Sequence, residues 1–344
     1  MHLSIRRVLL GSALVLLGGT ILSAGPSGYH VTKTIKLGGD GGWDYLTVDA
    51  KSRRVYISRG THVMVVDADT GALVGDIPNT NGVHGIAIAP DMDKGFISDG
   101  RDNNVTIFEV KTLKVLGTAP TGKNPDAIIY DPDSKRVFAF NGSSNDATAI
   151  DAKSGTVAGT IALGGKPEFA VADEKGQVFV NIEDTSEIVQ FDSKKLAIVN
   201  RWKIAPGEEP SGLAMDRKHR RLFSVCSNKL MVVIDADSGR VVTTLPIGSG
   251  TDAAGFDSET GLAFSSNGGD GTVTVAHEDT PDKFAVVENV PSLRRARTMA
   301  LDAKTHQVYT VTAEFGPAPA ATKEQPRPRA PMVPGSFTLL ILSR

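Results

Sequence analysis

Seven polar residues recur at one position of a repeated strand pattern, and these are the residues of the chain best suited to chemistry. They follow one another at intervals of 40 to 45 residues, and several come directly after a Pro or Gly that ends the preceding segment. The seven residues are Asp44, His84, Asp126, Glu168, Ser211, Asp252 and Arg297, and all except Ser211 can carry a charge in an otherwise apolar strand. If the strands line one central channel, these side chains form a ring at its mouth.

Three kinds of site can be built from this ring. As a metal site, Asp126 and Glu168 come from neighbouring copies and could share a hard cation such as calcium. The other acids, on the first and sixth copies, are expected to lie too far away to join one coordination sphere. As a catalytic site, His84, Glu168 and Arg297 would supply a base, an acid and an anion clamp for lactone opening or elimination. As a recognition site, the whole ring would bind a small polar ligand or a peptide end.

Recognition requires less precise placement of the side chains than metal binding or catalysis, so we favour a binding or interaction module over an enzyme. The alternative is a lactonase- or lyase-like hydrolytic enzyme that uses the same ring. His84 is the only histidine of the ring, which excludes a histidine-rich copper cluster, and no cofactor other than the divalent cation is indicated. A fourth interpretation competes with these three: the polar groups of the ring only cap strand ends and hold water in the channel.

The elements that must position the ring are repeats of one unit. Each copy begins with a short apolar strand and continues through turns into further strands, as in VMVVDADTGALVGDIP from Val63 and MVVIDADSGRVVTTLPIGSG from Met231. The first strands end at Asp49, Ala89, Asp131, Asp173, Asp216, Asp257 and Asp302, separated by 40, 42, 42, 43, 41 and 45 residues. A four-strand unit at this period is typical of WD40-like propellers. The sequence therefore predicts an all-β, seven-bladed β-propeller of four-stranded antiparallel blades.

The two ends of the chain are predicted to share the last blade. The segment TIKLGG at 34–39 matches TIALGG at 160–165, an outer strand with its corner, whereas the last copy ends on FTLLILSR and lacks an outer strand. The N-terminal strand is expected to complete this blade and so to remove an open sheet edge. A Pro-rich loop at 316–335 interrupts the last copy, and its six prolines predict neither helix nor ladder. By its place in the repeat, the loop emerges on the ring face.

The units RVYIS, VMVVDADTGALVGDIP and MVVIDADSGRVVTTLPIG resemble the YVTN-repeat β-propellers, and the whole chain is similar to the YncE-like family of secreted bacterial propellers. The resemblance covers about the whole mature chain, 25–344, as a single domain. It implies a fold and no particular activity, because neighbouring propeller families include lactonases, lyases, cofactor-bearing dehydrogenase subunits and copper reductase domains.

Residues 1–24 are predicted to be a secretory signal peptide. Arg6 and Arg7 precede an apolar run, and the small residues Ser23 and Ala24 end it. The mature protein is then periplasmic or secreted, without a transmembrane span. The formal net charge of the full chain, −2, argues against nucleic acid as a partner. The single cysteine of the chain, Cys226, excludes an internal disulfide and a cysteine-based zinc site. The expected partner is a small polar ligand or a protein on the channel-mouth face.

Overall fold

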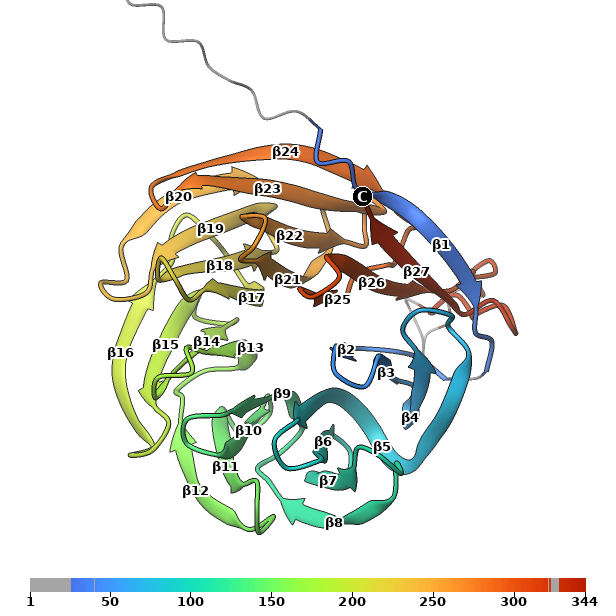
Figure 1. The fold of residues 1–344 in the computed structure, drawn as a ribbon, viewed down its shortest axis with the longest axis horizontal. Helices are drawn as coiled ribbons and strands as arrows, with labels where there is room; N and C mark the ends of the chain where they lie inside the picture. Colours follow the sequence, from blue (N-terminus) through green and yellow to red (C-terminus); the bar gives the residue numbers. More distant parts are fainter. Residues whose placement is uncertain (1–25, 40, 321, 323–327) are drawn as a thin grey trace, which may run out of the picture.

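The computed structural model describes residues 26–39, 41–320, 322 and 328–344. Every regular element in this part of the chain is a β-strand, and none of its segments forms a helix long and apolar enough to span a membrane. The strands form antiparallel sheets that surround a central axis (Figure 1). The all-β prediction is confirmed, whereas the predicted signal peptide, 1–24, lies outside the described residues.

Four sheets consist of four consecutive strands, with the first strand of each innermost in the ring (Figure 1). These strands are β9 (Pro125–Asp131), β10 (Arg136–Asn141), β11 (Asp146–Asp151) and β12 (Val157–Ala162); β13 (Pro167–Ala172), β14 (Gln177–Ile182), β15 (Glu187–Asp192) and β16 (Ala197–Lys203); β17 (Pro210–Asp216), β18 (Arg221–Cys226), β19 (Leu230–Asp235) and β20 (Val241–Pro246); and β21 (Thr251–Asp257), β22 (Leu262–Asn267), β23 (Thr272–Thr280) and β24 (Lys283–Pro291).

A fifth sheet has seven strands because one long strand belongs to two units. Its strands are β2 (Leu46–Asp49), β3 (Arg54–Ser58), β4 (Gly60–Asp67), β5 (Leu73–Ala89), β6 (Lys94–Asp99), β7 (Asn104–Glu109) and β8 (Val115–Pro120). The first part of β5 pairs with β4, from Leu73 opposite Val66, and its last part pairs with β6, up to Ala89 opposite Lys94. One continuous strand is thus the outer strand of one unit and the inner strand of the next.

The remaining sheet joins the two ends of the chain. It contains β25 (Met299–Asp302), β26 (Gln307–Thr312), β27 (Thr338–Ser343) and, outermost, β1 (His30–Lys36). β1 runs antiparallel to β27, from His30 opposite Ser343 to Lys36 opposite Thr338. The N-terminal strand therefore supplies the outer strand that the last copy lacks, as the TIKLGG match predicts.

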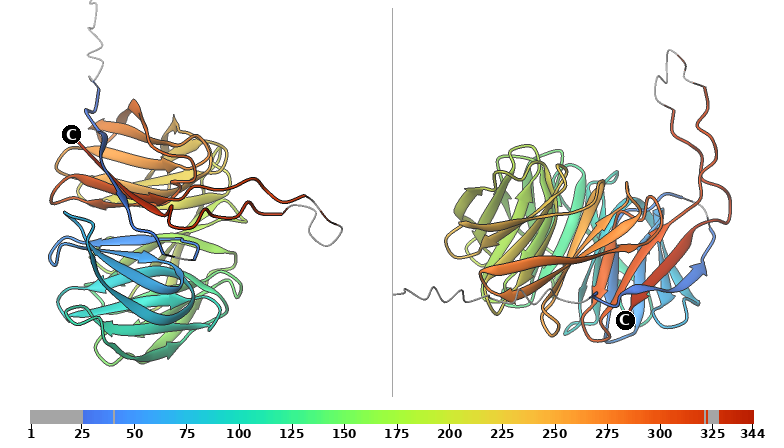
Figure 2. Two further views of the ribbon diagram at one scale, coloured as in Figure 1. Left: turned by 90° about the vertical axis from the view of Figure 1, so that its right-hand side faces the viewer. Right: turned by 90° about the horizontal axis from the view of Figure 1, so that it is seen from above.

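The Pro-rich loop leaves the ring as an arm whose base is paired (Figure 2). The Gly316 amide donates to the Pro331 carbonyl at 2.9 Å, and the Val333 amide donates to the Glu314 carbonyl at 2.8 Å. The expectation that this segment forms no ladder is wrong at its base, because the residues between the prolines keep amides that can pair. Residues 321 and 323–327 of the arm lie outside the described part of the chain.

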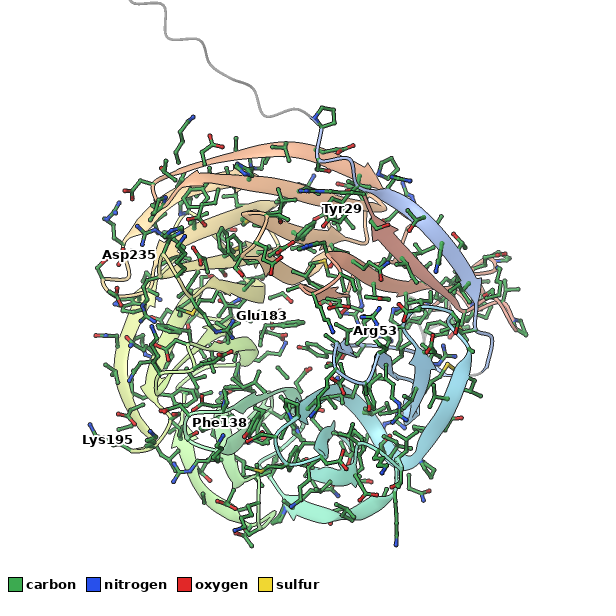
Figure 3. The ribbon with its side chains drawn as sticks, in the orientation of Figure 1. Tyr29, Arg53, Phe138, Glu183, Lys195 and Asp235 are labelled. Carbon is green, nitrogen blue, oxygen red and sulfur yellow. The ribbon has the colours of Figure 1, made fainter. Side chains whose placement is uncertain are left out.

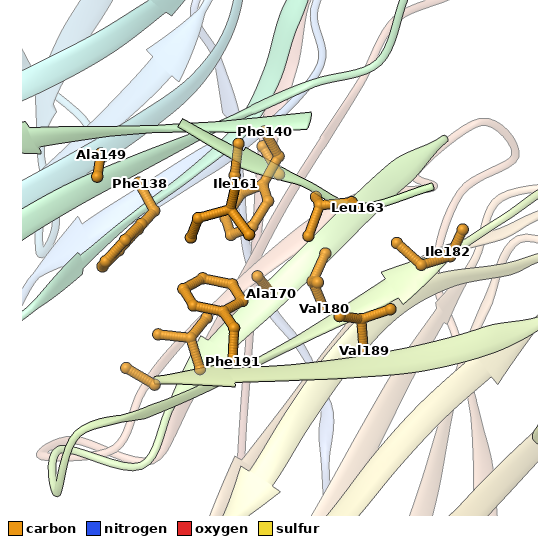
Figure 4. Packing of buried hydrophobic residues seen from close by; sticks show 14 residues of the cluster. Phe138, Phe140, Ala149, Ile161, Leu163, Ala170, Val180, Ile182, Val189 and Phe191 are labelled. Carbon is orange, nitrogen blue, oxygen red and sulfur yellow. The ribbon is translucent and has the colours of Figure 1, made fainter. Parts of the chain in front are cut away.

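The hydrophobic core lies between neighbouring sheets. Phe138 and Phe140 of β10 pack against Val180 of β14 and Phe191 of β15, and all four side chains are fully buried (Figure 4). Because both faces of each middle strand are covered, β18 is buried at all six positions, whereas the outermost strand β16 is mainly exposed.

The Asp at the end of the first strand has a structural role in the repeat. Asp131 accepts hydrogen bonds from the backbone amides of Asp133 at 3.3 Å and Ser134 at 3.1 Å. Asp216 accepts one from the amide of Lys218 at 2.9 Å. These contacts hold the turn between the first two strands, so the most regular signal of the sequence belongs to the fold and not to the site.

Candidate functional site

The structure places the seven predicted residues at the inner ends of the sheets, where each is half-buried. In five inner strands the pairing register is irregular at this point, and in β9 the irregularity encloses Asp126, between Pro125 and Ile128. The other four strands show the same feature. The irregularities enclose His84 (between Val83 and Ile86), Glu168 (between Pro167 and Ala170), Ser211 (between Pro210 and Leu213) and Asp252 (between Thr251 and Ala254). A β-bulge turns a side chain out of the regular alternation, and here it frees a polar group from the sheet ladder.

Six of the seven residues form one polar chain. His84 Nδ1 lies 2.6 Å from Asp44 Oδ2 and 3.5 Å from Asp126 Oδ1. The guanidinium of Arg297 donates to Asp44 Oδ1 at 2.7 Å and also binds the Asp252 carboxylate. The Ser211 hydroxyl lies 3.2 Å from Asp252 Oδ1. The two cationic side chains, His84 and Arg297, thus hold Asp44 between them.

Glu168 has a different partner. Lys166 Nζ lies 2.7 Å from Glu168 Oε1 and also binds Glu183, whose side chain lies on the inner side of the ring (Figure 3). Lys166 belongs to the corner directly before β13, where the fixed backbone of Pro167 separates it from Glu168. The cation that neutralises Glu168 therefore comes from the same sheet.

Tyr45, next to Asp44, lies among the acidic groups of the ring. Its aromatic ring packs on that of Phe169, with 4.3 Å between the centroids. Burial raises the pKa of Tyr45 well above 10, and the carboxylates of Asp126 and Glu168 add to that rise. The phenol is therefore neutral at any physiological pH and keeps a proton to donate.

Three acids of the ring, Asp126, Glu168 and Asp252, have raised pKa values and so hold their protons more strongly than usual. Burial, with the charge of Asp126, raises the pKa of Glu168 to about 8. Burial also raises the pKa of Asp252 to about 7, although Arg297 opposes the rise. The pKa of Asp126 is also raised, mainly through burial. Burial disfavours the charged imidazolium of His84, but the hydrogen bond to Asp44 and the charge of Asp126 outweigh it and raise its pKa above 6.5.

These groups surround a cavity of about 240 Å³ at the axis of the ring, which we call the axial cavity. Six of its lining residues are acids and only one, Arg297, is a base. The lining consists of Asp44, Tyr45, Asp126, Glu168, Glu183, Glu209, Ser211, Ser227, Thr251, Asp252 and Arg297. A cavity of this composition suits a cationic guest, since a positive charge replaces the protons that the crowded carboxyl groups otherwise keep.

The geometry adds Asp44 and His84 to the candidate metal ligands. Among the described residues, Asp44, His84 and Asp126 form a group whose ligand atoms all lie within 4.8 Å of one another. The acid of the first copy was expected to be too distant, but Asp44 reaches the centre because it precedes β2 and its side chain is held by His84 and Arg297. Asp126 and Glu168 do affect each other's charge, as predicted. Two carboxylates and an imidazole form a mixed oxygen and nitrogen set that suits zinc or manganese.

The three candidate catalytic residues are separated into different pairs. His84 binds Asp44, Glu168 binds Lys166, and Arg297 binds Asp44 and Asp252. Within the described part of the chain, no hydrogen bond or ion pair joins His84, Glu168 and Arg297 directly to one another. A base with an orienting carboxylate is present in the His84–Asp44 pair, which is the arrangement that a general base requires.

Sequence reasoning missed Tyr45 and Lys166. Tyr45 follows a ring residue at a position where four other copies carry the small residues Gly85, Ala127, Gly212 and Ala253, a fifth carries Thr298, and one carries a second aromatic residue, Phe169. A phenol among such small residues is the signal that could have found it. Lys166 stands two residues before Glu168, but nothing in the spacing shows which acid a flexible lysine will bind.

The comparisons with known proteins show the fold alone. No family model matches the chain, and no curated protein matches it either. A chain of Kuenenia stuttgartiensis hydrazine synthase superposes with a TM-score of 0.68 at 15% identity, covering 79% of this chain and 93% of that one. A chain of a mitotic checkpoint complex superposes with a TM-score of 0.74 at 12% identity, covering 98% and 99%. The chain is similar to both in having a WD40-like β-propeller fold.

Proposed function

We propose that this protein is an exported, seven-bladed propeller of the YncE-like type and serves as a binding module. The sharing of β5 supports the blade count, since it divides the seven-stranded sheet into two four-stranded units beside five other sheets. The pairing of β1 with β27 would close the ring. The apolar leader at 1–24 supports export to the periplasm or the medium, with 25–344 as a single domain.

The ligand of the axial cavity is proposed to be a small polar molecule that carries a positive charge. The observation that carries this proposal is the excess of six acids over one arginine around about 240 Å³ of space. The ammonium of an amine would donate hydrogen bonds to the carboxylates of Asp126, Glu168 and Asp252. The rings of Tyr45 and Phe169 add an aromatic face that attracts cations.

Calorimetric titration with putrescine, against 1,4-butanediol as its neutral analogue, tests this function. We expect saturable binding of the diamine and binding of the diol weaker by about tenfold or more, because a charge-assisted hydrogen bond contributes about 1.5–3 kcal/mol. Glu168→Gln should weaken the binding of putrescine by a similar factor. Asp102→Asn, which removes an exposed acid outside the cavity lining, should leave its affinity unchanged. Equal affinities for diamine and diol would overturn the proposal.

The second candidate function is a lactonase- or lyase-like reaction at the same ring of polar residues. The 2.6 Å contact of His84 with Asp44 favours it, because it holds an imidazole in one orientation. The test is to incubate the purified protein with lactones, esters and unsaturated uronates. Turnover that His84→Ala abolishes without lowering the melting temperature would establish the enzyme, and absence of turnover together with saturable amine binding would leave the binding module.

A further inference from the structure

A second and larger cavity, of about 650 Å³, lies beside the axial cavity and shares Arg297 with it. We call it the arm pocket because the base of the Pro-rich arm forms one of its walls. Its lining consists of Trp43, Gly250, Gly268, Gly269, Arg295, Arg297, Phe315, Ala318, Pro328, Arg329 and Ala330. The volume falls in the range typical of pockets for small organic molecules.

The charge of the arm pocket is opposite to that of the axial cavity. Three arginines line it and no acid does, in a chain with 37 basic and 39 acidic residues. Arg297 is already bound to Asp44 and Asp252. Arg295 and Arg329 form no ion pair with an acid of the described residues, so these two guanidinium groups are available to an anion. Guanidinium groups bind carboxylates through paired hydrogen bonds, which makes an organic acid a fitting guest.

The walls of the arm pocket are flat and largely apolar. Phe315 lies 6.0 Å from Trp43 between ring centroids, and Trp43 packs in turn on the buried ring of Phe337 at 5.3 Å. The Arg295 guanidinium lies over the Phe315 ring at 3.7 Å from its centroid. The stack of aromatic and guanidinium planes fixes the orientation of Arg295 and offers a surface to a planar group.

Two backbone features shape the arm pocket around Arg295 and Arg297. Its φ of 67° is in the left-handed region, which a side chain with a Cβ adopts at a cost. The corresponding positions, two residues before the ring residue, also have positive φ at Gly82, Asn124, Glu209 and Gly250, so the turn before the inner strand imposes this conformation. Gly268 lacks a Cβ that would come within 2.7 Å of Arg297, and so lets the pocket floor approach this residue.

We propose that the arm pocket binds an organic acid with a flat apolar body, such as an aryl carboxylate. Its carboxylate would lie between Arg295 and Arg329, and its body would pack on Trp43 and Phe315. The proposal goes beyond the function proposed for the axial cavity, because the ligand has the opposite charge and different residues hold it. Putrescine binding and organic acid binding can therefore fail independently.

The test uses Trp43 as its own reporter. The chain has two tryptophans, so Trp202→Phe leaves Trp43 as the only indole. In this background we expect 3-phenylpropanoate to change the Trp43 emission saturably. The neutral 3-phenylpropanamide should bind about tenfold more weakly or worse, because it lacks the charge-assisted pair. Equal affinities for acid and amide would overturn the proposal.

Two variants and a control locate the anion. Arg295→Gln and Arg329→Gln should each weaken 3-phenylpropanoate by about fivefold or more, since each removes one partner of the carboxylate. Arg101→Gln carries the same change of charge on the loop between β6 and β7, outside the pocket, and should bind like the parent. Near-ultraviolet circular dichroism and the melting temperature check that each variant is folded. Folded Arg295→Gln and Arg329→Gln that bind the acid with parental affinity would overturn the proposal.

Discussion

Tyr45 and Phe169 pack on each other across the axis of the molecule, with 4.3 Å between their ring centroids and 46° between the ring planes. They belong to the segments that begin β2 and β13, which lie on opposite sides of the ring (Figure 1). Phe169 also contacts two of the hydrophobic clusters between sheets. The pair therefore bounds the axial cavity with aromatic rings and connects the acidic site to the core.

Removing the Tyr45 ring should destabilise the protein more than removing its hydroxyl. Tyr45→Ala deletes a half-buried aromatic ring that packs on Phe169, and we expect a loss of about 2–4 kcal/mol in the free energy of unfolding. Tyr45→Phe keeps the ring and should change the free energy of unfolding by about 1 kcal/mol or less. Urea denaturation of the two variants at one pH measures the difference. Equal losses would mean that the hydroxyl, and not the stacking, stabilises this position.

The raised pKa of Glu168 predicts how stability changes with pH. The folded protein holds this proton up to a pKa of about 8, whereas the unfolded chain releases it near the ordinary glutamate value of 4.5. Between these values the folded state binds more protons, so raising the pH lowers stability in that window. Glu168→Gln removes this dependence, and its stability relative to the wild type should rise between pH 5 and pH 8 by up to a few kcal/mol.

Melting temperatures of both proteins from pH 5 to pH 9 check this expectation. Lys166 keeps Glu183 as a partner in the variant, so the substitution does not leave an unpaired buried cation. Asp184→Asn, a substitution in the loop between β14 and β15 and outside the cavity lining, should follow the wild-type curve. Parallel curves for Glu168→Gln and the wild type would show that Glu168 is ionised throughout this range.

The strand pattern and the ring positions could be predicted from the sequence because the repeat imposes both. A four-strand unit repeated every 40 to 45 residues places position 44 and its counterparts at equivalent points of successive sheets. The match of 34–39 with 160–165 likewise predicts the pairing of β1 with β27, because equivalent segments of a repeat adopt equivalent places. The periodicity of the sequence thus predicts where the ring residues lie and which strands pair.

The contacts within the site could not be predicted, because they depend on side-chain reach across the axis. Asp44 was expected to be too distant from Asp126, yet both contact His84. Repeat spacing gives the order of residues around a ring but not the width of the channel, and a channel bridged by Tyr45 and Phe169 is narrow. The arm pocket was missed for a similar reason, since it joins residue 43 to residues 315 and 329, and no repeat relates these positions.

The crowded carboxylates predict a response to divalent cations. Calcium should raise the melting temperature of the wild type by mass action, because a cation that binds the folded state relieves the repulsion between Asp126 and Glu168. Asp126→Asn should remove the rise. Zinc tests the group of Asp44, His84 and Asp126, and His84→Ala should abolish a zinc response while leaving a calcium response.

The wild type and the two variants are compared in thermal shift measurements with each metal chloride, after treatment with a chelator. Asp102→Asn serves as the control for the loss of one acid outside the cavity lining. A calcium response that is identical in the wild type and in Asp126→Asn would place the cation elsewhere. No response in either would leave protonation as the means by which the folded protein relieves the charge, and carboxyl titration by NMR would then show it.

The N-terminal strand should be essential for stability. Deleting 30–39 removes β1, which pairs with β27 along its length. It also removes Ile35 and Leu37, which pack on the hydrophobic cluster between the first and last sheets. The deletion exposes the backbone groups of β27 and apolar surface beneath them, so we expect aggregation or a loss of several kcal/mol in the free energy of unfolding.

Lys33→Ala, which alters only an exposed side chain of β1, is the matched control and should melt like the parent. Light scattering and thermal melts of the protein without its leader measure both effects. A deletion variant that melts with the parent and stays monomeric would show that the ring does not depend on β1.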